Sequence, residues 1–101
     1  METTSAVRTL AALAQETRLR VFRLLVEAGS EGLPAGDIAR ELDLPAATLS
    51  FHLKELVASG LAGGARDGRS IFYSANFERM RELLGYLSAN CCRRATRQRS
   101  C

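Results

Sequence analysis

Three cysteines lie close together at the C-terminal end of this 101-residue sequence. Cys91 and Cys92 are adjacent, Cys101 is the last residue, and residues 1–90 contain no cysteine. Thiolates are soft ligands that select soft ions. As(III) and Sb(III) bind sulfurs in a three-coordinate pyramid, whereas structural zinc normally takes four protein ligands. Three cysteines with no histidine beside them therefore predict a binding site for As(III), and by the same chemistry for Sb(III).

The same thiols are compatible with other chemistry. Methylated arsenicals have fewer free coordination positions and need only two of the cysteines. A disulfide between Cys101 and either Cys91 or Cys92 would instead make a redox switch. The sequence leaves open whether Cys101 binds an ion within its own chain or across a dimer. A thiol oxidoreductase is disfavoured, because there is no C-x-x-C motif and no βαβ pattern, so we expect no enzyme and no organic cofactor.

Positive charge gathers in the same segment as the cysteines. Four of the fourteen basic residues are arginines within residues 91–101, which leaves ten basic and eleven acidic residues in residues 1–90. A basic tail suits contact with nucleic acid, although it is equally typical of a solvated chain end. We expect one folded domain over residues 1–90 and a Cys/Arg-rich tail over residues 91–101 that carries the inducer site. The sequence shows no signal peptide and no long apolar run, which predicts a cytoplasmic protein with no membrane contact and with reduced thiols.

Apolar spacing and turn residues predict the elements that hold this tail. The expected helices cover residues 5–14, 16–28, 34–42, 45–59 and 76–90, and the expected strands cover residues 61–66 and 69–74. Gly60, followed by the apolar Leu61, is typical of a helix C-terminus. Asp67-Gly68 suits the centre of a type I′ hairpin turn. The predicted fold is mainly α with a small β-hairpin wing, in the order α-α-α-α-β-β-α.

Two of these helices have the pattern of a helix-turn-helix. Residues 34–42 and 45–59 are joined by a short turn at Asp43-Leu44, and in such a unit the second helix lies in the DNA major groove. The hairpin that follows would lie as a wing against the minor groove or the backbone. The candidate DNA-binding residues are Thr48, Ser50, Phe51, His52 and Lys54 on the helix and Arg66, Arg69 and Ser70 on the wing. Which of them touch phosphates and which touch bases stays open.

The first and last helices carry apolar stripes of their own. Val7, Leu10 and Leu13 form one stripe, and Phe77, Met80, Leu84 and Leu87 form the other. A helix-turn-helix core of this size does not cover both stripes. They therefore predict a homodimer formed through the first and last helices, with packing inside one chain as the alternative.

Three segments resemble the ArsR/SmtB family of winged-helix repressors. QETRLRVFRLL (residues 15–25) is similar to the second helix of that family. LPAATLSFHLKELVASGLA (residues 44–62) is similar to its recognition helix, and RDGRSIFYS (residues 66–74) to its wing. The resemblance covers roughly residues 6–90. It implies a winged helix-turn-helix homodimer that represses transcription from double-stranded operator DNA and leaves that DNA when an inducer binds.

The resemblance also narrows the inducer site. Arsenic sensors of one branch carry two cysteines on the helix before the recognition helix, where this chain has Pro34 and Gly36. Zinc sensors use histidine and carboxylates on the last helix, where residues 76–90 contain neither His nor Asp. The tail resembles a branch that binds arsenite through a C-terminal cysteine pair and a third cysteine.

The prediction that follows is an arsenite-released repressor. Binding of the ion would pull on the last helix, or would withdraw the Arg-rich tail from DNA. A redox-sensing repressor of the same fold is the first alternative. A metal-scavenging or interaction domain that binds no DNA is a further one.

Overall fold

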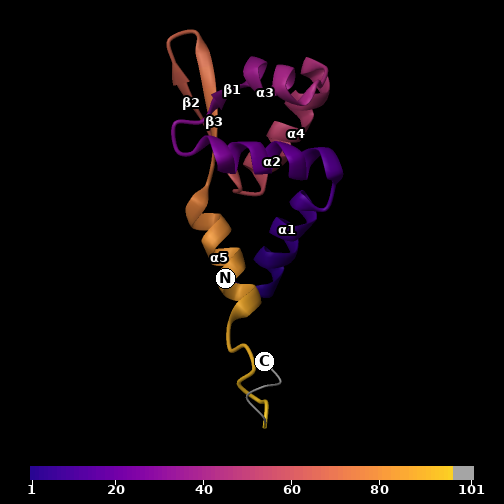
Figure 1. Ribbon diagram of the computed structural model, residues 1–101, viewed down its shortest axis with the longest axis vertical. Coiled ribbons are helices and arrows are strands. Elements are labelled where there is room, and N and C mark those ends of the chain that lie inside the picture. Colours follow the sequence, from indigo (N-terminus) through magenta and orange to yellow (C-terminus); the bar gives the residue numbers. More distant parts are fainter. Residues whose placement is uncertain (97–101) are drawn as a thin grey trace.

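A computed structural model describes residues 1–96 and has the predicted mainly helical order, with one additional short strand (Figure 1). The elements are α1 (Thr3–Leu13), α2 (Glu16–Ala28), β1 (Leu33–Pro34), α3 (Ala35–Leu42), α4 (Ala46–Ala58), β2 (Ala62–Asp67), β3 (Ser70–Ala75) and α5 (Phe77–Ser88). The predicted winged helix-turn-helix is confirmed. None of the helices in residues 1–96 is long and apolar enough to cross a membrane.

The core lies where α2, α3 and α4 meet the base of the hairpin. Its fully buried side chains are aliphatic and come from each of these elements: Val21, Leu25, Ile38, Leu49, Leu56 and Leu61. Asp43 ends α3 in the left-handed conformation, and its N–H donates to the carbonyl of Ala39. This turn sets the short connection to α4 and fixes the angle between the two helices of the motif.

The C-terminus of α4 has the geometry that Gly60 and Leu61 predict. Gly60 has a φ of +82°, and its N–H donates to the carbonyl of Val57. The N–H of Leu61 donates to the carbonyl of Leu56 at 3.0 Å. These two bonds form a Schellman motif, in which glycine accepts the left-handed backbone at little cost. Because Leu61 is fully buried, the motif also directs the chain from α4 into β2.

The hairpin turn lies one residue later than the sequence predicts. Asp67 pairs with Ser70 in the β2–β3 register, so the two loop residues are Gly68 and Arg69 and not Asp67-Gly68. Gly68 has a φ of +64°, whereas Asp67 and Arg69 have no positive φ. A positive φ at the first loop position alone is typical of a type II′ turn, which favours glycine there. The shift places Arg69 at the tip of the wing.

The sheet contains a third strand that the sequence pattern does not predict. β1 pairs antiparallel with β3, with Leu33 opposite Tyr73 and Pro34 opposite Phe72. Proline is tolerated there because β1 is an edge strand. The register of β2 against β3 is continuous through Gly63 and Gly64, so there is no bulge at these glycines. A Cβ atom at Gly64 would come within 3.2 Å of the side chains of Ile71 and Tyr73.

α1 and α5 extend away from the sheet and the helix-turn-helix and converge toward their outer ends (Figure 1). The hydroxyls of Thr3 and Tyr86 are 2.5 Å apart and join the two helices near their outer ends. Phe77 and Met80 pack against the core of the same chain, so only part of the predicted α5 stripe is uncovered. The large apolar side chains left exposed on these two helices are Val7, Leu10, Leu84 and Leu87.

Candidate nucleic-acid interface and thiol site

The exposed face of α4 contains four of the five helix residues predicted to bind DNA. Thr48, Ser50, Phe51 and Lys54 are exposed, while Leu49, Leu53 and Leu56 on the opposite face are buried. The buried leucines recur at helical spacing and fix α4 against the core. The hydroxyls and the ammonium group of the exposed face therefore project away from the protein.

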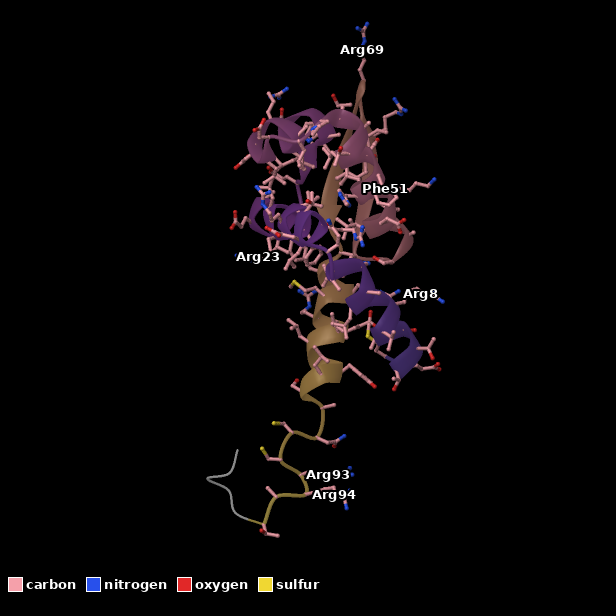
Figure 2. All side chains as sticks on the ribbon, turned by 90° about the vertical axis from the view of Figure 1, so that its right-hand side faces the viewer. Arg8, Arg23, Phe51, Arg69, Arg93 and Arg94 are labelled. Carbon is pink, nitrogen blue, oxygen red and sulfur yellow. The ribbon has the colours of Figure 1, made fainter. Side chains whose placement is uncertain are left out.

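The wing extends this face beyond the helix. Arg66, Arg69 and Ser70 are all exposed, and Arg69 projects from the tip of the hairpin (Figure 2). An open groove of about 590 Å³ separates the wing from α4, with Ser50 and Lys54 on its helical side and Ile71 on the hairpin. The helical side of this groove thus presents a hydroxyl and an ammonium group, whereas its hairpin side is formed by Gly64, Ile71 and Tyr73 and not by the arginines of the wing. The contact of helix and wing with DNA stays a prediction.

His52 does not lie on this face, so the expected exposure of its side chain is wrong, while its contact with DNA stays a prediction. The side chain is only 7% exposed. Its Nδ1 is 3.2 Å from Nη1 of Arg18. Because arginine stays protonated and can only donate, His52 accepts through Nδ1 and carries its proton on Nε2. Burial first, and then the charge of Arg18, lower the pKa of His52, while Glu55 acts in the opposite sense.

Arg18 is a positioning residue that the motifs in the sequence did not single out. Its Nε donates to the carbonyl of Ala12 at the end of α1, while its Nη1 donates to His52 on α4. The backbone N–H of Arg18 in turn donates to the side chain of Gln15, which caps α2. One guanidinium therefore joins α1 to the recognition helix. The burial of His52 could have been predicted from the sequence, because His52 is three residues after Leu49 and four before Leu56. This spacing places it on the same side of the helix as the buried leucines.

Cys91 and Cys92 lie just beyond α5, and their Sγ atoms are 3.6 Å apart. The predicted helix to residue 90 is two residues too long, because α5 ends at Ser88. The Ser88 hydroxyl donates to the Leu84 carbonyl, a bond that competes with the helical backbone. Asn90 and Cys92 then adopt positive φ values of 59° and 60°. The two cysteines are thus set in consecutive turns and not on a continuous helix.

The third predicted ligand, Cys101, lies outside the described residues. Within residues 1–96 no three histidine, cysteine or acidic side chains gather closely enough to hold a metal ion. The site formed by Cys91, Cys92 and Cys101 therefore stays a prediction, as does the division of the chain at residue 90.

The described part of the basic tail lies far from the candidate DNA-binding face. Arg93 and Arg94 follow α5 at one end of the molecule, and Arg69 lies at the opposite end (Figure 2). Phe51 projects from α4 in the half of the molecule that carries Arg69. The longest dimension of the chain is 57 Å. Direct withdrawal of Arg93 and Arg94 from DNA bound by the same chain is therefore disfavoured.

Comparisons with known proteins agree with this architecture. A model of a helix-turn-helix domain matches residues 13–62, which run from the end of α1 to the start of β2. The regulator YgaV of Escherichia coli K12, described as an HTH-type transcriptional regulator, is 31% identical over 86% of this chain and 86% of its own length. The nodulation protein NolR of Rhizobium meliloti is 34% identical over 78% of this chain, but the match covers only 62% of NolR.

A solved structure gives the same result in three dimensions. An ArsR-like transcriptional regulator from Rhodococcus sp. RHA1 superposes with a TM-score of 0.76 and 28% identity. The superposition covers 90% of this chain and 86% of that one. The superposition therefore extends over nearly the whole of this chain.

Proposed function

We propose that this chain, which belongs to the ArsR-like family of winged helix-turn-helix transcriptional regulators, is a dimeric repressor released from operator DNA by As(III). The observation that carries the DNA-binding part is the exposed polar face of α4 beside a wing tipped by Arg69. A helix of this width fits the major groove of B-DNA, and a basic hairpin beside it contacts the adjacent backbone or minor groove.

The contacts of this face divide into two kinds. Lys54, Arg66 and Arg69 bear the charges that suit phosphates, and phosphate contacts position a protein without specifying sequence. Thr48, Ser50 and Phe51 project from the first two turns of α4 and are placed to meet base edges. Affinity would then depend steeply on salt, because the phosphate contacts release counterions.

Dimerisation is supported by the uncovered apolar surface of α1 and α5. Val7, Leu10, Leu84 and Leu87 have exposed fractions between 41% and 59%. Contiguous exposed apolar side chains on paired helices are typical of protein interfaces. A second copy of the chain related by a twofold axis would cover them and would present two recognition helices to two half-sites.

Cys92 is disulfide-bonded in this structure, so the inducer site is proposed for the reduced protein, with the thiols of Cys91 and Cys92 beyond α5 as its first two ligands. With metal–sulfur bonds of about 2.3 Å, as for zinc, two sulfurs on one ion at a pyramidal angle of about 100° lie about 3.5 Å apart. The distance between Cys91 Sγ and Cys92 Sγ is 3.6 Å, which is close to that spacing. Cys101 would supply the third sulfur of the pyramidal As(III) site, which favours As(III) or Sb(III) over a four-coordinate ion. The arrangement resembles the arsenite-responsive branch with a C-terminal cysteine pair.

The signal would pass along α5 to the recognition helix. The ligands adjoin the end of α5 that carries Leu84 and Leu87, in the proposed dimer interface. At the other end of α5, Asn76 caps the helix and its Nδ2 donates to the carbonyl of Gly60 just after α4. A shift of α5 would therefore act on both the dimer and the end of α4. A coupling of about 1–3 kcal/mol weakens operator binding 5- to 150-fold.

The test is fluorescence anisotropy of the reduced protein on DNA from upstream of its own gene, during titration with arsenite. We expect tight binding without arsenite and release near one arsenic per three thiols. Cys91→Ser and Cys92→Ser should bind the same DNA and fail to release it. Arg94→Gln, a change in the same turns that removes no sulfur, should respond like the wild type.

Other results would change the proposal in specific ways. If the Cys92→Ser variant still leaves the DNA when arsenite is added, the thiol site is excluded. Release by peroxide and not by arsenite would favour the redox-sensing repressor of the same fold. Failure to bind any upstream fragment would contradict the DNA-binding function itself.

A further inference from the structure

Phe51 is an unusual member of the proposed DNA-binding face. Its side chain is 56% exposed, and it is the one aromatic residue among the large apolar side chains left exposed in residues 1–96. It stands in the second turn of α4 between the polar Ser50 and Lys54 and projects outward from the helix (Figure 2). The exposed apolar residues of α1 and α5 have the proposed dimer partner to cover them. Phe51 lies on a different part of the chain and needs another partner.

The ring of Phe51 contacts the side chain of its neighbour His52. It packs against the ring of His52 in an edge-to-face contact, with centroids 5.3 Å apart and an interplanar angle of 67°. His52 is itself buried and accepts a hydrogen bond from Arg18, whose Nε donates to the carbonyl of Ala12. A continuous series of contacts thus runs from α1 to the Phe51 ring. Because such edge-to-face pairs are favourable, Phe51 is oriented before any partner binds.

The chemistry of base edges decides what Phe51 can contact. In the major groove adenine, guanine and cytosine present hydrogen-bond donors and acceptors, whereas thymine adds its C5-methyl group. A phenyl ring has no donor or acceptor, so its favourable contact with a base edge is apolar and is made with that methyl group.

We infer that Phe51 recognises thymine in the operator through the C5-methyl group and that His52 positions its ring. The inference rests on the proposed DNA-binding function. Covering one methyl group corresponds to about a fourfold change in affinity for each half-site.

The experiment replaces thymine by deoxyuridine, which removes only the methyl group. Each thymine of the bound upstream fragment is replaced in turn, and the Kd is measured by fluorescence anisotropy for wild type and variants. For the wild type we expect one replacement per half-site to weaken binding about fourfold. Phe51→Ala should bind the thymine fragment more weakly than the wild type does. Its Kd should be the same for the thymine fragment and for the fragment with deoxyuridine at that position. Phe51→Leu, which keeps an apolar side chain, should retain part of the difference.

Two further variants separate recognition from general effects on binding. Lys54→Gln, a neighbour expected to contact phosphate, should weaken binding to both fragments equally and leave their ratio unchanged. His52→Gln keeps an acceptor for Arg18 but removes the ring beneath Phe51. His52→Gln should bring the Kd values for the thymine and deoxyuridine fragments closer together. A general loss of protein stability would instead weaken binding to both fragments alike and leave the ratio of the two Kd values unchanged.

The outcomes distinguish this inference from the proposed function. A wild-type protein that binds DNA but tolerates every replacement overturns the inference and leaves the repressor proposal standing. The inference is equally overturned if Phe51→Ala keeps the full difference between thymine and uracil. A wild-type protein that binds no fragment overturns both proposals.

Discussion

The end of this molecule that carries the proposed DNA-binding face and the end formed by α1 and α5 differ in how completely one chain covers its apolar residues. At the first end, α2, α3 and α4 enclose a core of fully buried aliphatic side chains, and the outer face is mainly polar. At the second end, two paired helices leave Val7, Leu10, Leu84 and Leu87 uncovered. The first end thus buries its own apolar residues, whereas the second end leaves apolar side chains that the proposed second copy of the chain would cover.

The two ends also have different proposed roles: one binds DNA, and the other carries the inducer site that regulates this binding. The groups of the proposed DNA-binding face are held by a core that a distant ion does not touch. The proposed inducer site adjoins the end formed by α1 and α5, where the free energy of dimerisation is most easily changed. Within residues 1–96, side-chain hydrogen bonds link the ends through Asn76, which donates to Gly60, and through Arg18, which donates to Ala12 and His52. Substitutions at each end should therefore give distinct results.

The largest effect is expected from a charge placed on the uncovered helix face. In Leu84→Glu, the twofold axis introduces the change twice into the interface. Each leucine loses about 1.5–3 kcal/mol of burial free energy, and an unpaired carboxylate adds a desolvation cost. The Kd of the dimer should rise by more than about a hundredfold. Sedimentation velocity as a function of concentration measures the change.

A control for this substitution lies at the other end. Leu19 on α2 is also exposed, at 43%, but lies beside Leu42 of α3 and away from the α1–α5 pair. Leu19→Glu should leave the dimer intact. If Leu84→Glu were as dimeric as Leu19→Glu, the interface would have to lie elsewhere and the comparison between the two ends would fail.

An intermediate effect is expected from Arg18, which joins the two ends. Arg18→Ala leaves the Ala12 carbonyl and the buried His52 Nδ1 without their donor. A buried polar group without a partner costs about 1–3 kcal/mol. The free energy of unfolding in urea should therefore fall by about 2 kcal/mol. The exposed Arg20, on the same helix, is the matched control: Arg20→Ala should stay within about 0.5 kcal/mol of wild type. Equal stability of the two variants would show that the Arg18 contacts contribute nothing.

The same contacts mark the limit of prediction from sequence. The order of elements, the end of α4 at Gly60 and the exposure of Thr48, Ser50 and Lys54 follow from local patterns of polarity and turn residues. Local patterns carry these features because each depends on residues a few positions apart. The winged helix-turn-helix and the outward face of its second helix were therefore predictable.

The errors arise where distant segments decide the structure. The prediction for His52 fails because its polarity suggests exposure, whereas it stands between buried leucines and its partner Arg18 is 34 residues away. The turn lies at Gly68-Arg69 because strand register, and not the Asp-Gly dipeptide, sets which residues are in the loop. β1 has no signal in the sequence because a strand of two residues exists only through its pairing with β3.

The smallest effect is expected from protonation of His52, the only histidine in the chain. Its pKa is lowered in the folded protein, chiefly by burial and then by Arg18, whereas the unfolded chain has the ordinary value of about 6.5. Below that pH the unfolded state binds more protons than the folded state, so the free energy of unfolding falls as the pH is lowered and is fully restored above it. The slope from one group is at most about 1.4 kcal/mol per pH unit.

His52→Gln isolates this contribution, because glutamine accepts a hydrogen bond from Arg18 but does not titrate. Urea unfolding of both proteins should be measured from pH 7.5 down to pH 5. The wild type should lose more stability over that range than His52→Gln, and the difference should develop below about pH 6.5. Groups that do not interact with His52 contribute equally in the two proteins and cancel in the comparison. Parallel curves would mean that His52 is as easily protonated in the fold as in the unfolded chain.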